Sequence, residues 1–472
     1  MAARGMVREF VHPRLELTRW APLQRIMKHR AFQFMLILPN LAVFVLVLVA
    51  AFFGTPVGNR NFAIIFVWIV WWAALITLLI PLAGRIWCAM CPIPAPGEWL
   101  QRLAVIARRP GRPFTLGLSW PKALRNIWLQ NGTFLAVALF SAIILTRPLA
   151  TGIVLTVFIG LALLLSLLFE RRVFCRYVCP VGGFIGLYAM VAPLELRVKD
   201  PQICVTHKEK DCIRGNANGY PCPWLSYPGN LWRNIDCGLC TECLKACPKE
   251  NVGLFLRPFG QDLLLARAPG WKGRSLDEAY KAFIMLSCAL IYSAVYIGPW
   301  GFLKEWANLS DPAGFALYAA GFLGLNLIGL PGLFLIAVAA ARWIARADVP
   351  LRRLFTELAY ALVPLGLAGW IAFTLSFVLI NISYAIPLFS DPLGRGWDLL
   401  GTASYPWTPY MPELVPFLQL PFLWVGLIAS IVLAFRIAQQ NFGDGQAARR
   451  ALLPIAGFIT LIVLLFQRLY LG

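Results

Sequence analysis

The sequence predicts an all-α polytopic membrane protein with about nine transmembrane helices and one small polar insert rich in cysteine. Three observations lead to this fold class. Hydrophobic residues make up 59% of the 472 positions, and charged residues only 14%, where soluble domains carry about 25%. The third observation is that apolar runs of about 20 residues, the length that crosses a bilayer, recur along the chain.

These runs divide the chain into four parts. A basic N-terminal tail (1–30) precedes a four-span block (31–193), the polar insert (194–280) and a five-span block (281–472). Pro331 and Pro364 fall inside two of the longer runs and predict kinks, because proline removes a backbone donor. The nine expected spans are residues 31–53, 62–83, 130–146, 151–169, 281–303, 314–341, 355–389, 414–435 and 451–467.

The placement of lysine and arginine predicts the orientation. With the N-terminus inside, the outer segments hold only five of the 42 basic residues, and basic residues are retained in cytoplasmic loops. The N-terminus and the insert are therefore expected on the cytoplasmic side of a bacterial inner membrane, and the C-terminus in the periplasm. The first span is expected to be an uncleaved anchor. This distribution explains the net charge of +20, so membrane lipid, and no nucleic acid, is the expected partner.

Histidine is too scarce for an intramembrane haem. The only histidines are His12, His29 and His207, and none lies in an apolar run. A b-type haem needs paired axial histidines inside its helices, so no haem b is expected. Twelve cysteines remain as the plentiful redox or metal ligand.

The insert contains the run Cys237-Gly238-Leu239-Cys240-Thr241-Glu242-Cys243-Leu244-Lys245-Ala246-Cys247-Pro248. This C-x2-C-x2-C-x3-C-P spacing is that of a bacterial ferredoxin, and it predicts one [4Fe–4S] cluster bound by the first three cysteines. The paired knuckles of a zinc ribbon fit it poorly. A disulfide is excluded on the reducing side of the membrane.

The ferredoxin arrangement requires a second arm. Cys222, which precedes Pro223, is the candidate that completes the cluster of Cys237, Cys240 and Cys243, whereas Cys247 turns to a second cluster. That second cluster has only Cys204 and Cys212 upstream, so one ligand is missing. The alternatives are a ligand from His207, a carboxylate such as that of Asp211, a three-iron cluster, or no cluster.

An internal repeat supplies four further thiols. The second span ends in Arg85-Ile86-Trp87-Cys88-Ala89-Met90-Cys91-Pro92, and the fourth in Arg172-Val173-Phe174-Cys175-Arg176-Tyr177-Val178-Cys179-Pro180. Both pairs follow an even-numbered span, so Cys88, Cys91, Cys175 and Cys179 are expected at one cytoplasmic surface. They suit another iron–sulfur cluster, zinc or Cu(I); the alternative is two unrelated helix ends. Cys288, alone in an apolar run, is expected to be a packing residue.

The repeated Cys-x2–3-Cys-Pro motifs and the ferredoxin run together resemble the polyferredoxin membrane proteins of the NapH and NosR type, over about residues 31–260. The cysteines of the run, its second arm and the repeat allow two or three [4Fe–4S] clusters in all. The resemblance implies electron transfer between quinone or quinol and a periplasmic, denitrification-type reductase or its carrier, as a quinol-dehydrogenase-type subunit of anaerobic respiration.

Three departures separate the chain from that family. The first Cys-Pro motif has two intervening residues instead of three, the first ferredoxin arm is degenerate, and five additional spans follow the insert. No flavin attachment sequence is recognised, so no covalent flavin is expected. A rival hypothesis is an accessory factor that uses its clusters to reduce or deliver metal to a respiratory metalloenzyme. A transporter with a regulatory cluster ranks last.

The five-span block offers one candidate proton group. Glu357 lies at the inner end of a span, where it would relay a proton from quinol or pair with Arg352 or Arg353. The aromatic residues of the outer loop 390–413 form either an interfacial belt or a docking site for a periplasmic partner.

Overall fold

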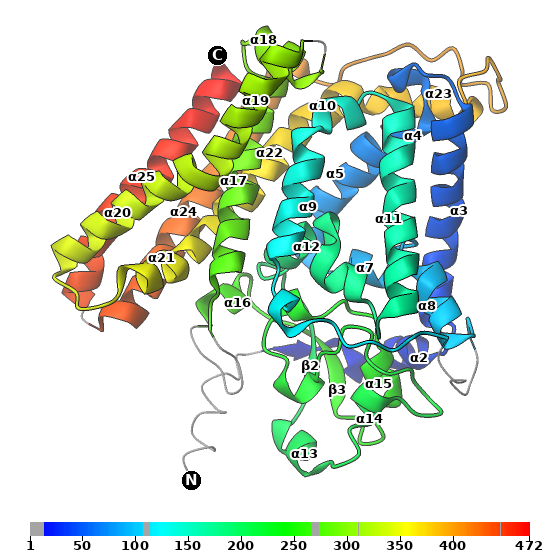
Figure 1. Cartoon of the computed structure of the whole chain (residues 1–472), viewed down its shortest axis with the longest axis vertical. Helices are drawn as coiled ribbons and strands as arrows, with labels where there is room; N and C mark the ends of the chain where they lie inside the picture. Colours follow the sequence, from blue (N-terminus) through cyan, green and yellow to red (C-terminus); the bar gives the residue numbers. More distant parts are fainter. Residues whose placement is uncertain (1–13, 107–113, 266–272, 310, 444) are drawn as a thin grey trace. The chain divides into compact units, whose positions relative to one another are not determined.

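The computed structural model describes residues 14–106, 114–265, 273–309, 311–443 and 445–472 (Figure 1). The chain folds into two compact units, each assembled from three stretches of sequence. Unit 1 comprises residues 1–44, 78–130 and 157–273, and unit 2 comprises residues 45–77, 131–156 and 274–472. All cysteines of the repeat and of the insert belong to unit 1.

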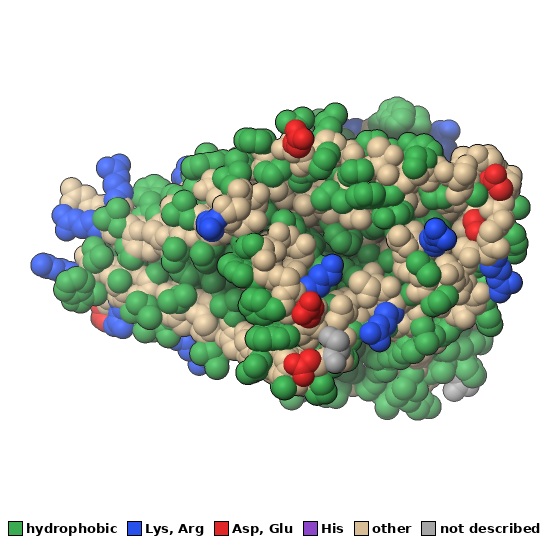
Figure 2. All heavy atoms as spheres, turned by 90° about the horizontal axis from the view of Figure 1, so that it is seen from above, with side chains coloured by type: hydrophobic (Ala, Val, Ile, Leu, Met, Phe, Trp, Pro, Cys, Tyr) green, Lys and Arg blue, Asp and Glu red, His purple; other side chains and the backbone are tan. Residues whose placement is uncertain are grey.

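Eight helical stretches among the described residues are long and apolar enough to cross a membrane, so the chain is a membrane protein. Figure 2 looks onto the ends of the long helices and shows hydrophobic side chains spread over this face, with Lys, Arg, Asp and Glu side chains among them. The eight stretches are Phe32–Phe53, Phe62–Ala83, Pro148–Leu168, Leu276–Tyr296, Pro312–Ala345, Leu351–Ser390, Pro412–Phe442 and Gly445–Leu471.

The third expected span, residues 130–146, is not among these eight. Its sequence forms helix α9 (Trp128–Leu139) and the short helix α10 (Ser141–Ile144), separated at Phe140, whose φ of −92° and ψ of 14° leave the helical region. Helix α9 alone is 12 residues long, too short to cross a bilayer. The expected count of nine is therefore not established.

Several spans are interrupted where the sequence supplies a reason. In the span Pro312–Ala345, a π-helical segment, η9 (Leu325–Gly329), separates α19 (Pro312–Gly324) from α20 (Leu330–Ala345), which has Pro331 in its first turn. The 3₁₀ segment η10 (Tyr360–Leu362) likewise precedes α22 (Val363–Asn381) and Pro364. A proline in the first turn needs no backbone donor, so each helix restarts there.

The insert of unit 1 is built on a three-stranded antiparallel sheet in the order β1-β3-β2. Strand β3 (Val252–Leu256) pairs on one side with β2 (Leu194–Val198) and on the other with β1 (Leu15–Glu16). Short helices surround it (Figure 1): α2 (Ala21–Lys28), α13 (Pro201–Thr206), α14 (Asp211–Arg214), α15 (Glu242–Ala246) and α16 (Gln261–Leu264).

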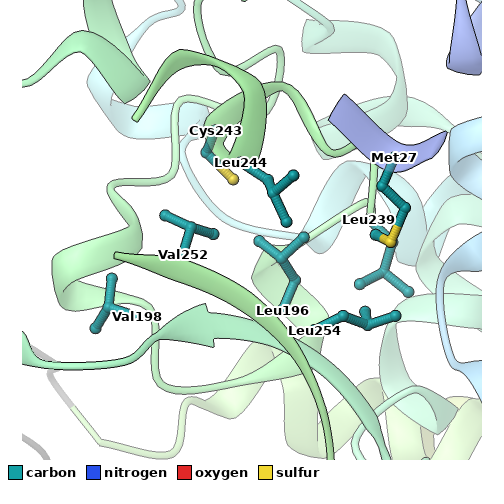
Figure 3. Close-up of a cluster of buried hydrophobic side chains, with 8 residues drawn as sticks. All are labelled: Met27, Leu196, Val198, Leu239, Cys243, Leu244, Val252 and Leu254. Carbon is teal, nitrogen blue, oxygen red and sulfur yellow. The ribbon is translucent and has the colours of Figure 1, made fainter. Parts of the chain in front are cut away.

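Residues 14–28, expected to belong to a basic tail, are part of this insert; residues 1–13 lie outside the described ranges. Figure 3 shows Met27 of α2 in one buried cluster with side chains of both long strands and of the ferredoxin run. The Thr241 hydroxyl donates to the carbonyl of Met27 at 3.3 Å. Arg14 and Glu195 form an ion pair at 3.8 Å. Burial of Met27 fixes α2 against the sheet, because it removes apolar surface from water.

Unit 1 also contains the helices that carry the repeat. These are α6 (Ile80–Ala83), α7 (Ile86–Met90), α8 (Ala95–Arg102), the π-helical segment η6 (Phe174–Val178) and α12 (Pro180–Tyr188).

Unit 2 is a bundle of long helices. Its elements include the π-helical segment η3 (Ile65–Trp71), α5 (Trp72–Ala74), α17 (Leu276–Tyr296), α18 (Gly301–Ala307), α21 (Leu351–Ala359), α23 (Ala385–Ser390), α24 (Val415–Phe442) and α25 (Gly445–Leu471).

Candidate metal centre

The structure brings the four cysteines of the repeat together, and we call them the repeat set: Cys88, Cys91, Cys175 and Cys179. Cys88 lies on α7, which ends at Cys91, and Cys175 lies on η6, which ends at Cys179. The Cys179 thiol caps α12 by accepting from the Gly182 amide at 3.2 Å. Burial raises the pKa of Cys179 to about 11, and the neighbouring Cys88 adds to that rise. Burial and the other three thiols raise the pKa of Cys175 well above its usual value.

An arginine stands three residues before the first cysteine of each motif, and both arginines are 4% exposed. Arg172 donates from Nη1 to the Cys88 carbonyl at 2.9 Å and from Nε to Glu98 Oε2 at 2.9 Å. Arg85 donates to the carbonyl of Ile235 and lies 4.1 Å over the ring of Trp224. The repeat therefore delivers two thiols and one buried guanidinium from each copy.

Four cysteines of the insert form a second group, which we call the central set: Cys222, Cys237, Cys240 and Cys243. Within the run, Leu239 and Thr241 have φ of 52° and 63°, in the left-handed region. These two residues reverse the chain between successive cysteines, a conformation that non-glycine residues hold only at some energetic cost and that is common at functional sites. Burial is the main cause of the raised pKa of Cys243. Cys240, Cys222 and Cys237 raise it further, so the four thiols lie together. The structure thus places Cys222 beside the three cysteines of the run, and binding of a cluster by these four residues stays a prediction.

The repeat set and the central set share the same two arginines. Burial raises the pKa of Cys175 and of Cys240, and Arg172 opposes both rises. Burial raises the pKa of Cys237 to about 11, and Arg85, which also faces Cys179, opposes it. A backbone hydrogen bond also joins the two sets: the Arg172 amide donates to the carbonyl of Pro223, the residue after Cys222, at 3.0 Å. One pair of buried cations thus lies beside thiols of both sets.

Trp224 packs tightly against the central set. It is 2% exposed, and a Cβ placed on Gly238 would lie 2.0 Å from its Nε1 atom. Only glycine fits between Cys237 and Leu239 while this indole remains in place.

The remaining three cysteines of the insert, Cys204, Cys212 and Cys247, form the outer set. Asn251 holds two of them: its side-chain amide donates to Cys204 Sγ at 3.3 Å, and its backbone amide to Cys247 Sγ at 3.4 Å. Burial raises the pKa of Cys212 to about 12, with further contributions from Cys204 and Cys247. All three residues are partly exposed, whereas Cys222, Cys240 and Cys243 are buried.

His207, the candidate for the missing ligand, pairs with carboxylates. Its Nε2 lies 3.3 Å from Asp211 and 3.8 Å from Glu209. Within the described part of the chain, the side chain that accompanies the three outer thiols is instead Tyr227, whose hydroxyl donates to the Cys204 carbonyl at 2.8 Å. Burial raises the pKa of Tyr227 to about 12, and all three cysteines contribute. The sequence did not single out this tyrosine.

The donor sets fit iron–sulfur clusters. The repeat and central sets each offer four thiols, the usual ligation of a [4Fe–4S] cluster, and the outer set offers three. When deprotonated, Cys88, Cys91, Cys175 and Cys179 would hold one cluster, and Cys222, Cys237, Cys240 and Cys243 another.

Unit 2 contains buried ionisable groups that the sequence interpretation passed over. Lys281 is 0% exposed, and Glu278 is 8% exposed and accepts from the Tyr360 hydroxyl. Glu357 forms an ion pair with Arg274, a partner that neither sequence alternative, a proton relay or a pair with Arg352 or Arg353, had named. A lysine within an apolar helix is itself a signal of a functional site, so Lys281 could have pointed to these buried ionisable groups from the sequence. Cys288, expected to be a packing residue, is fully buried.

Comparisons with known proteins agree with this chemistry. Residues 64–113 and 151–198 match the model of a family described as a 4Fe-4S binding domain, and each stretch contains one cysteine pair of the repeat. Over 142 residues, or 29% of the chain, the sequence is 28% identical to the putative electron transport protein YccM of Escherichia coli (strain K12). The match spans 35% of that relative's length. No solved structure matches the chain. The chain is thus an iron–sulfur membrane protein for which these similarities support a role in electron transfer.

Proposed function

We propose that the chain transfers electrons between the quinone pool and a respiratory reductase of the periplasmic, denitrification type, or its carrier, as the resemblance to the NapH and NosR type implies. The observation that carries the proposal is the connected order of the three thiol sets within unit 1. The repeat and central sets share Arg85 and Arg172. The pKa of Cys243 in the central set is raised mainly by burial and by the other central thiols, and Cys212 of the outer set adds to this rise, so the outer set lies next to the central set.

The bound clusters would supply one-electron redox chemistry, and the chain's own residues would set the conditions for it. The first two sets include the buried cysteines Cys88, Cys175, Cys222, Cys240 and Cys243, whereas every cysteine of the outer set is partly exposed, so the first two sets are less open to water. The outer set is the more exposed end, and we assign it the exchange of electrons with a redox partner. Cluster potentials depend on nearby charge and solvent exposure, so the two arginines favour the reduced clusters of the inner sets.

Buried ionisable groups in unit 2 support the link to quinol. Oxidation of a quinol releases protons as well as electrons. The hydroxyl of Tyr360 joins Glu278, and Lys281 lies one turn further along the same helix, fully buried. Ionisable groups within a membrane helix are costly and commonly functional. We assign these residues to a proton path that begins at a bound quinol.

The proposed topology places the N-terminus and all three sets in the cytoplasm and the C-terminus in the periplasm of the inner membrane. The electrons then have to cross about 30 Å of hydrocarbon to reach a periplasmic acceptor. A quinone or a partner subunit is proposed to bridge that distance.

Anaerobically purified protein in lipid nanodiscs tests the proposal. A quinol analogue should reduce the clusters, seen as bleaching of the iron–sulfur absorbance and the appearance of reduced-cluster EPR. Lys281→Met should slow reduction by the quinol at least about tenfold, equivalent to about 1.4 kcal/mol, and leave reduction by dithionite unchanged. The exposed Lys304→Met, the matched control, should behave as wild type. Clusters that dithionite reduces but the quinol leaves oxidised would refute the quinol link.

Deletion of the gene separates this proposal from the accessory-factor hypothesis. Under electron transfer, the target reductase accumulates with its metal and lacks only electrons. A target reductase without its metal would instead favour an assembly role.

A further inference from the structure

The outer set differs from the other two in the number of its cysteines. Cys204 and Cys247 are joined through Asn251, and Cys212 adds a third thiol. Among the described residues, the other eight insert and repeat cysteines fall into two complete groups of four, and Cys288 lies in unit 2. A cubane with four irons needs four protein donors, so one corner of a cluster here has no thiolate.

Tyr227 is built into this site. Its hydroxyl donates to the carbonyl of Cys204 at 2.8 Å. Gly229 is pressed between the two residues, since a Cβ there would lie 2.7 Å from the Tyr227 ring and 2.9 Å from Cys204 Cβ. Lys210 Nζ lies 4.6 Å over the same ring. These contacts fix the ring beside the set from three directions.

The competing donors are engaged elsewhere. The imidazole of His207 and the carboxylates of Asp211 and Glu209 bring their ligand atoms within 4.8 Å of one another. His207 pairs with both carboxylates, while the outer thiols interact with Tyr227, Asn251, Cys222 and each other. The carboxylate of Asp200, which also acts on Cys204, accepts from the Gln202 amide at 2.8 Å as the N-cap of α13. Asn251 meets these thiols through N–H groups, which cannot bind iron, whereas the phenol of Tyr227 brings an oxygen donor to all three.

We propose that the outer set binds its cluster through three cysteines only, with the Tyr227 hydroxyl at the fourth corner, so that this cluster alone releases one iron on mild oxidation. The inference rests on the proposed iron–sulfur function and deepens it. With ferricyanide as the one-electron oxidant, the reaction is [4Fe–4S]²⁺ → [3Fe–4S]⁺ + Fe²⁺ + e⁻. A phenol oxygen is a weaker ligand than a thiolate for the soft iron sites of a cluster.

A cluster with one weakly held corner gives the partly exposed end of the series a distinct chemistry. At its fourth iron an exogenous ligand or a partner's side chain can replace the phenol. The inner sets, with four thiols each, have no such position.

The test oxidises anaerobic full-length protein with ferricyanide and records EPR and released iron. Wild type should give one three-iron EPR signal per chain and lose one iron. Tyr227→Cys supplies the fourth thiol and should abolish both effects. Tyr227→Phe, which removes the oxygen donor, should give the three-iron signal at a lower ferricyanide concentration than wild type. The matched control Val205→Cys adds an exposed thiol next to Cys204 and should behave as wild type.

His207→Ala discriminates the competing ligand and should also behave as wild type. If wild type resisted oxidation and His207→Ala produced the three-iron signal, histidine would be the ligand and the inference would be wrong. A three-iron signal that persists in Tyr227→Cys would equally overturn it. These outcomes differ from failure of the proposed function, in which the three-iron signal forms as expected but quinol reduces no cluster.

Discussion

Replacing Arg172 by glutamine tests whether the buried arginines couple the repeat set to the central set. Arg172 contacts the Cys88 carbonyl and Glu98, and it opposes the pKa rise of both Cys175 and Cys240. Glutamine can still donate to the Cys88 carbonyl, but it removes one positive charge. Less positive charge disfavours the added electron, so the reduction potentials of both clusters should fall.

The size of the fall follows from the geometry. Nη1 lies 2.9 Å from the Cys88 carbonyl oxygen, which puts the charge about 6 Å from that residue's sulfur by ordinary bond lengths. At that distance and an effective dielectric of about 20, a unit charge contributes about 2.8 kcal/mol, or about 120 mV for one electron. Glu98 cancels part of this field, so we expect a fall of about 50–100 mV.

The substitution also affects stability, which requires a matched control. Glu98 keeps Arg102 as a partner, so the loss should be nearer to a charged hydrogen bond, about 1.5–3 kcal/mol, than to a wholly broken buried pair. Arg257→Gln provides the control. Arg257 is buried and pairs with Asp262, and the groups that shift its pKa are carboxylates and not thiols. It should lose stability without a change in potential.

EPR-monitored redox titration in nanodiscs measures the potentials of the three clusters separately. The expected pattern is a fall for the repeat and central clusters and none for the outer cluster. Unchanged potentials in Arg172→Gln, or equal shifts in all three clusters or in Arg257→Gln, would refute the coupling.

Four further predictions concern the insert. Gly238→Ala should displace Trp224 and abolish the central cluster's EPR signal, whereas Gly132→Ala, with open space at its Cβ, should not. Burial raises the pKa of Cys237 in the apo chain to about 11, so its alkylation at pH 8 should be about 100-fold slower than that of an ordinary thiol. The alkylation rate should then increase about tenfold per pH unit up to about pH 11. A rate that levels off near pH 9 would contradict this. The same shift stabilises the apo fold below about pH 9 and is lost as the pH approaches 11. Met27→Ala should lower the free energy of unfolding of the insert by about 2–4 kcal/mol in denaturant titrations, and an unchanged midpoint would exclude α2 from its core. Chelation of iron should make the insert sensitive to protease while the helices of unit 2 stay resistant, because metal binding is coupled to folding.

The central set was predictable because its chemistry is local in sequence. Cys237, Cys240 and Cys243 lie within seven residues, and that spacing restricts them to one corner each of a small cluster. Cys222 required only the rule that a second arm ends in Cys-Pro. The repeat was equally readable, because each copy has the same order of arginine, aromatic residue and cysteines.

Contacts between distant segments were not predictable. Residues 14–28 are strongly basic and therefore resemble a solvated tail, but β1 completes a sheet whose other strands lie about two hundred residues away in sequence. Tyr227 and Trp224 carry no motif, and only the fold shows that one lies beside the outer set and the other beside the central set. The break at Phe140 likewise has no proline or glycine to announce it, so an apolar run of ordinary length was expected to be one span.

The duplicated motif explains why the inner sets lie together at all. Two cysteines from one hairpin cannot complete a four-thiol site, so the repeat has to bring its two copies into contact. The arginine that each copy places three residues earlier then lies beside the shared thiols, where two buried positive charges offset part of the negative charge of four thiolates. The Arg85 guanidinium also donates to the carbonyl of Ile235, and the Arg172 backbone amide donates to that of Pro223, so the residues that carry the neutralising charges also hold the insert against the repeat. Assembly of one cluster site therefore positions the next.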